Sequence, residues 1–161
     1  MNIPHDSDLL NLLILAYLCY MAGDFFLLRS DQKSFGLGII AFFMGHLCFI
    51  LQFFARIKNP MALPIVLVIM LYPLYKLLAI TRNAGKAKLP MRIYTLMMCF
   101  FIASSAMTMN FFLLFGTTIF TLSDTLLAKN VTSQKKIHSD IQVMGTYGLA
   151  LIALSIGTIL L

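Results

Sequence analysis

The chain contains six apolar runs, each about 20 residues long and nearly free of charge. A helix of that length crosses a hydrocarbon core of roughly 30 Å and satisfies its own backbone hydrogen bonds there. The mean hydropathy of +0.91 and the 60% share of apolar residues lie far outside the range of soluble proteins. We therefore expect an all-α, polytopic transmembrane helix bundle that forms a single domain over residues 1–161 of a lipid-embedded protein. The expected spans are approximately 9–28, 36–54, 61–80, 91–108, 111–128 and 141–161.

The fourth and fifth of these spans belong to one uninterrupted apolar stretch, which runs from Met91 to Ala128. As a single helix, its roughly 38 residues would extend for about 57 Å at 1.5 Å per residue, which is too long for one crossing. We therefore predict that a tight turn near Met109 and Asn110 divides the stretch into two spans.

Basic residues predict the orientation of the spans. Nine of them lie on the side where the first span ends, whereas only Arg56 and Lys58 lie on the opposite side. Because loops rich in lysine and arginine stay in the cytoplasm, we expect both termini to be extracytoplasmic. The net charge of +6 then suits an anionic leaflet and does not indicate nucleic-acid binding. The nine are Arg29, Lys33, Arg82, Lys86, Lys88, Arg92, Lys129, Lys135 and Lys136.

Two aspartates lie inside apolar spans, where a carboxylate is costly and indicates function by default. Asp24 occurs in YMAGDFFLLR of the first span, and Asp124 occurs in FTLSDTLLAK of the fifth. Both spans run in the same direction, and each aspartate is about four residues from the cytoplasmic end, so the two carboxylates are expected at nearly the same depth. We predict that they face each other in the bundle interior.

Polar residues at helical spacing accompany both aspartates, and a polar strip is better placed in the bundle interior than against lipid. Further polar side chains come from the other four spans, and together they predict a cavity that opens toward the cytoplasm. The strips are Tyr17, Tyr20 and Asp24 on one span and Thr117, Thr121 and Asp124 on the other, with Gly23 and Ser123 as the small residues before the aspartates. The further residues are His46, Tyr72, Lys76, Tyr94, Gln142 and Tyr147.

Several of these residues have a purely structural alternative. Lys76 could extend to the interface or pair with Asp124, and His46 could bond a neighbouring helix. Tyr72, Tyr94 and Tyr147 could belong to an interfacial aromatic belt, which is the role we expect for Tyr94. The three cysteines lie within spans and form no CxxC pair, so we expect them to be small buried apolar groups; they are Cys19, Cys48 and Cys99.

Two carboxylates at one depth in an apolar cavity suit acid and base chemistry. Mutual repulsion and low dielectric leave one of them protonated and the other ionised, as in the hydrolysis of glycosides. An acid-labile ether on a lipid would fit such a pair. Zinc hydrolysis fits less well, since the chain has no HExxH motif, and serine hydrolysis fits poorly because no GxSxG motif occurs. We expect neither a metal nor another cofactor.

Four segments in their order along the chain resemble the YhhN family, also called the TMEM86 or lysoplasmalogenase family. They are AGDFFLL, FGLGIIAFFMGHLCFI, TIFTLSDTLLA and a last span with Gln142 and Tyr147. Family members usually open with an additional pair of spans that carries a Lys-Pro element, so the resemblance aligns the start of this chain with the family's third span. It implies a multi-pass hydrolase that cleaves the vinyl ether bond of lysoplasmalogens to a fatty aldehyde and a glycerophospho-base.

By the matching motifs, the resemblance makes Asp24 and Asp124 the essential carboxylates and His46 a pocket residue. The expected pocket residues are Tyr20, His46, Tyr72, Thr121, Ser123 and Tyr147. The expected substrate is a lysophospholipid with its head group toward the basic loops, and the expected membrane is the bacterial inner membrane or, in a eukaryote, the endoplasmic reticulum. The sequence does not predict the head group or the oligomeric state.

Two other classes of function use the same residues. In a small proton-coupled transporter, Asp24 and Asp124 would load and release protons, although the chain shows no convincing inverted repeat. In a structural membrane protein, replacing either aspartate by asparagine would change stability and nothing else.

Overall fold

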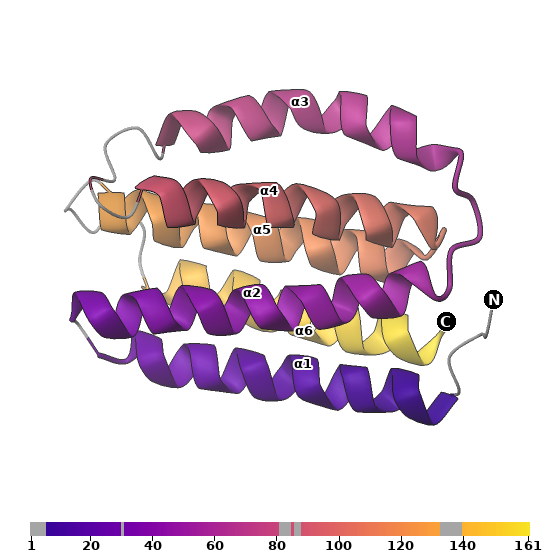
Figure 1. Cartoon of the computed structure of the whole chain (residues 1–161), viewed down its shortest axis with the longest axis horizontal. Coiled ribbons are helices and arrows are strands. Elements are labelled where there is room, and N and C mark those ends of the chain that lie inside the picture. Colours follow the sequence, from indigo (N-terminus) through magenta and orange to yellow (C-terminus); the bar gives the residue numbers. More distant parts are fainter. Residues whose placement is uncertain (1–5, 30, 81–84, 86–87, 133–139) are drawn as a thin grey trace. The chain divides into compact units, whose positions relative to one another are not determined.

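Six α-helices make up the described part of the computed structural model, and no strand occurs among these residues (Figure 1). The structure describes residues 6–29, 31–80, 85, 88–132 and 140–161, without the side chains of several helix residues that include Tyr72 and Lys76. Each expected span coincides with a helix, and most helices extend beyond the apolar run by several residues. The helices are α1 (Asp6–Leu27), α2 (Gln32–Phe54), α3 (Ala62–Ile80), α4 (Lys88–Met107), α5 (Phe111–Thr132) and α6 (Asp140–Ile159).

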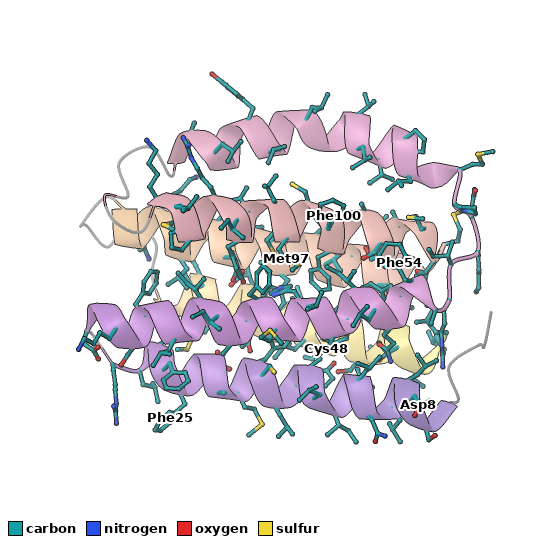
Figure 2. All side chains as sticks on the ribbon, viewed as in Figure 1. Asp8, Phe25, Cys48, Phe54, Met97 and Phe100 are labelled. Carbon is teal, nitrogen blue, oxygen red and sulfur yellow. The ribbon has the colours of Figure 1, made fainter. Side chains whose placement is uncertain are left out.

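Five helices in the described residues are both long and apolar enough to cross a membrane: α1, α2, α4, α5 and α6. Large apolar side chains are exposed along these helices, as expected for surfaces that face lipid rather than water. Phe100 on α4 is one example, with 56% of its surface exposed (Figure 2). The chain is thus a multi-pass membrane protein, whereas the sixth span and the orientation of the termini stay predictions.

The chain divides into two compact units, residues 1–56 and 57–161, and each is described by itself. Whether one domain spans the whole chain therefore stays a prediction. In the first unit α1 and α2 form an antiparallel hairpin, and Cys48 lies between them (Figures 1 and 2). At the end of the hairpin opposite the α1–α2 connection, Nε2 of Gln52 donates a hydrogen bond of 3.2 Å to the backbone oxygen of Leu9.

Glycines bring α1 and α2 close together in a reciprocal way. A Cβ on Gly23 of α1 would lie 2.7 Å from Cε2 of Phe42 on α2, so the ring occupies the space that the glycine leaves. Gly45 of α2 accommodates the ring of Tyr20 on α1 in the same manner. Small residues at a helix interface allow this close approach in membranes, where packing rather than hydrophobic exclusion drives association.

In the second unit α4 contacts α3 and α5, and α5 also packs against α6. The α5–α6 pair repeats the reciprocal arrangement of the first unit. Gly116 of α5 faces Leu154 of α6, and Gly157 of α6 faces Leu113 of α5, with a Cβ there only 2.9 Å from the backbone nitrogen of Leu113. These contacts hold the two helix backbones at a close and fixed separation.

A tight turn separates α4 from α5, which confirms the turn predicted near Met109 and Asn110. Met109 has a positive φ of 56°, and the side-chain oxygen of Asn110 accepts hydrogen bonds from the backbone nitrogens of Phe112 and Leu113 at 3.0 and 3.3 Å. Asn110 thereby caps α5. Its amide nitrogen also donates to the backbone oxygen of Gly157 at 3.1 Å, so the turn is fastened to α6.

Asp31 caps the N-terminus of α2. Its side chain accepts a hydrogen bond of 2.9 Å from the backbone nitrogen of Ser34, and its extended backbone (φ −85°, ψ 149°) is typical of an N-cap. Hydrogen bonds from the side chain and then the backbone of Ser34 lower the pKa of Asp31 from its usual 3.8. The cap is therefore strongest when Asp31 is ionised, because the charge also faces the positive end of the helix dipole.

We expect Asp31→Ala to lower the thermal midpoint of the purified protein at neutral pH, because an orphan N–H at the start of α2 loses its acceptor. The lowered pKa of Asp31 adds stability at pH values above 3.8 that is lost as the pH falls through the folded-state value. The difference in thermal midpoint between the parent and Asp31→Ala should accordingly become smaller in acid. Asp31→Asn is the control, since it keeps an acceptor but does not titrate. Equal midpoints for parent and Asp31→Ala at neutral pH would contradict the cap.

Candidate functional site

The residues of the predicted pocket fall into two groups, one in each unit. In the first unit Tyr20 and His46 are fully buried between α1 and α2, and their ring centroids lie 5.3 Å apart. Nδ1 of His46 lies 2.5 Å from the backbone oxygen of Phe42, which assigns the proton to Nδ1 and the lone pair to Nε2. The structure thus brings together two of the predicted pocket residues on facing helices.

Asp24 lies on α1 one turn after Tyr20 and directly after Gly23. Gly23 turns toward Phe42, whereas the carboxylate of Asp24 is exposed on the adjoining face of the helix. At the end of this helix the guanidinium of Arg29 lies 5.9 Å from the centre of the Phe25 ring, in a cation–π contact. A carboxylate therefore lies in the last turn of α1, and a cation follows two residues after the helix ends at Leu27.

In the second unit, the interface between α4 and α5 is a seam of four side-chain contacts in antiparallel order. Apart from Tyr94 and Asp124, all its members are buried. The contacts, counted from the turn, are Ser105 with Thr117 (2.8 Å between hydroxyl oxygens), Phe101 with Phe120 (6.2 Å between ring centroids), Met98 with Thr121 (3.6 Å from Sδ to Oγ1) and Tyr94 with Asp124 (2.5 Å from Oη to Oδ2).

The last contact of this α4–α5 seam involves the second aspartate of interest. The hydroxyl of Tyr94 donates to Oδ2 of Asp124, and both side chains are half-buried. A carboxylate oxygen with a short O–H donor makes one of the stronger kinds of hydrogen bond in proteins. Asp124 is therefore held in a defined orientation while it keeps access to its surroundings.

Ser123 and Thr121 precede Asp124 closely in the sequence, but their hydroxyl groups do not donate to its carboxylate. Ser123 donates to the backbone oxygen of Val143 on α6 at 2.9 Å, and Thr121 donates to the backbone oxygen of Thr117 at 2.9 Å. Serine and threonine in apolar helices commonly bond to a backbone carbonyl in this way. Ser123 thus fastens α5 to α6, whereas the bond from Thr121 to Thr117 stays within α5. The donor that reaches Asp124 is Tyr94 of α4, a partner that the sequence alone did not indicate.

Tyr147 of α6 packs its ring edge-to-face against Phe120 of α5, with 5.4 Å between the centroids. Together with the bond from Ser123, this contact places α6 against the side of α5 that carries Phe120 and Ser123. The structure therefore brings Thr121, Ser123, Asp124 and Tyr147 into one region of the second unit.

Two of the expected residues, Tyr72 and Lys76, have side chains outside the described part of the structure. Asp24 and Asp124 belong to different units, so the expectation that they face each other stays a prediction. Within the described residues, no three His, Cys, Asp or Glu side chains gather as metal ligands. Of the cysteines, Cys48 and Cys99 are buried as expected, and Cys19 is half-buried.

Comparison with known proteins relates the chain to a protein family. No curated protein and no solved structure matches the chain significantly. A sequence model of the YhhN family matches residues 3–158, which is nearly the whole chain and includes all six helices apart from the last residue of α6. This match confirms the resemblance inferred from the AGDFFLL and TIFTLSDTLLA segments, and the protein therefore belongs to the YhhN family.

Proposed function

We propose that the protein is a membrane-embedded hydrolase that cleaves the vinyl ether bond of lysoplasmalogen-type lysolipids. Membership in the YhhN family is consistent with this activity. The observation that carries the proposal is Asp124, a carboxylate in an apolar helix that is oriented by a phenol and remains half-exposed. A costly group held in so definite a geometry is typical of a functional site.

In the proposed reaction, one aspartate donates a proton to the vinyl carbon remote from the ether oxygen. The resulting oxocarbenium ion is stabilised by the other, ionised aspartate, which also orients a water molecule. Addition of that water returns a proton and gives a hemiacetal, whose carbon–oxygen bond then breaks. The products are a fatty aldehyde and a glycerophospho-base with a free hydroxyl, so one water is consumed and no redox cofactor takes part.

The substrate class fits the charges and apolar surfaces of the chain. Arg29 and Lys33 flank the connection between α1 and α2 as exposed cations, and both can bind a head-group phosphate. The single alkenyl chain would lie against apolar helix surfaces. In the first unit, exposed Met21 and Phe25 provide such a surface. A lysolipid is therefore a better candidate than a soluble ether.

The direct test presents the detergent-purified protein with three lysolipids that share one head group and one chain length. They differ only in the linkage at the first glycerol carbon, which is a vinyl ether, a saturated alkyl ether or an acyl ester. We expect fatty aldehyde from the vinyl ether and no cleavage of the other two, because only the vinyl ether forms an oxocarbenium ion on carbon protonation. A well-folded protein that releases no aldehyde would contradict the proposal.

A further inference from the structure

The α4–α5 seam adds a residue to the proposed reaction. We propose that Tyr94 is a positioning residue, whose phenol holds Asp124 as the ionised carboxylate that stabilises the oxocarbenium ion. The inference rests on the proposed function and assigns a task to a residue that the sequence places among the polar side chains of the cavity but for which it favours an interfacial role. Its basis is the hydrogen bond of 2.5 Å from Oη of Tyr94 to Oδ2 of Asp124.

The position of the phenol is fixed by the rest of the seam. Tyr94 precedes Met98 by one helical turn, and Met98 precedes Phe101 by another, so all three lie on the face of α4 that packs against α5. Met98 and Phe101 are fully buried and contact Thr121 and Phe120. Sliding or rotation of α4 against α5 would break these buried contacts together with the one between Tyr94 and Asp124, so the packing of the seam opposes any displacement of the phenol.

The chemistry of the two groups defines which of them donates the hydrogen bond between Tyr94 and Asp124. An ionised carboxylate only accepts hydrogen bonds, and a phenol offers one O–H donor. The neighbouring hydroxyls of Ser123, Thr121 and Thr125 on α5 each donate to a backbone carbonyl rather than to Asp124. Tyr94 thus provides from α4 a hydroxyl donor that these three residues direct elsewhere.

Positioning matters for the proposed chemistry because the cation forms at one carbon and one oxygen only. A carboxylate that rotates freely spends part of its time turned away from the developing charge, whereas one locked by a phenol needs no reorganisation during the reaction. Loss of the phenol oxygen should therefore lower the rate of the chemical step and leave lysolipid binding nearly unchanged.

The test compares Tyr94→Phe with the parent in the aldehyde-release assay. The variant keeps the ring and removes only the donor, so we expect kcat to fall about 10- to 100-fold with KM changed by less than about twofold. Tyr75→Phe is the matched control, since Tyr75 is 68% exposed on α3, and it should retain parental kinetics. Thermal midpoints of all three proteins report whether the fold is kept.

The outcomes separate this inference from the function on which it rests. A parent that releases no aldehyde overturns the proposed function and the role of Tyr94 with it. An active parent with an equally active Tyr94→Phe overturns the role of Tyr94 alone. A variant that loses kcat only in proportion to a lowered thermal midpoint also overturns it, because Tyr94 would then act through stability.

Discussion

Replacing Asp124 by asparagine is expected to reduce the release of fatty aldehyde about 10²- to 10⁴-fold, the range typical for loss of an acid, base or charge-stabilising group. Asparagine has the shape of aspartate, and its side-chain oxygen still accepts a bond from Tyr94, so the α4–α5 seam should persist. Only the negative charge is lost. The measurement is kcat for aldehyde release, with the thermal midpoint as a check of folding.

Asp24→Asn should produce a loss of the same order, because both carboxylates take part in the proposed reaction. Asp8→Asn serves as the control, since Asp8 is an exposed aspartate in the first turn of α1 (Figure 2). It should leave kcat unchanged. If Asp24→Asn and Asp124→Asn only lower the thermal midpoint and retain activity, the two residues are structural and the proposed mechanism is wrong.

The second large effect is expected for Gly157→Ala. The added Cβ would lie 2.5 Å from Cδ2 and 2.9 Å from the backbone nitrogen of Leu113, and a backbone atom cannot turn aside as a side chain can. Overpacking of this kind typically costs about 1–3 kcal/mol. We therefore expect the α5–α6 contact to loosen and the thermal midpoint to fall.

Gly148→Ala is the matched control on the same helix, because nothing lies within 4 Å of a Cβ placed at Gly148. Both changes gain the better helix propensity of alanine, about 1 kcal/mol, so the difference between them isolates the steric contact. A Gly157→Ala variant as stable as Gly148→Ala would show that α5 and α6 can separate without cost, contrary to the packing described.

Hydropathy predicts the helices well because most of the apolar runs are bounded by polar or proline residues. The fifth span was expected to end near residue 128, but α5 extends to Thr132. Backbone hydrogen bonding does not stop where the apolar residues stop, so a helix continues until a cap or breaker ends it. At the start of α2 that signal was present, since Asp31 precedes the helix and caps it.

The candidate site was less predictable, because a membrane helix that is apolar on most sides gives little indication of which face meets which neighbour. The contact between Tyr94 and Asp124 depends on the alignment of α4 against α5. One signal was available: Tyr94 lies 16 residues before Asn110 (110 − 94) and Asp124 lies 14 residues after it (124 − 110), at similar distances from the predicted turn. Side-chain direction and packing were still needed to show that the two meet.

The turn at Met109 and Asn110 bears on how the protein enters its membrane. Only three residues, 108–110, lie between the end of α4 and the start of α5, so the two helices are tethered closely at this turn. We therefore expect the pair to insert together as a helical hairpin, with Ser105 already beside Thr117. If the two helices insert jointly, Tyr94 can donate its hydrogen bond to Asp124 before the carboxylate enters the hydrocarbon core. The carboxylate is then not exposed to lipid without a hydrogen-bond donor.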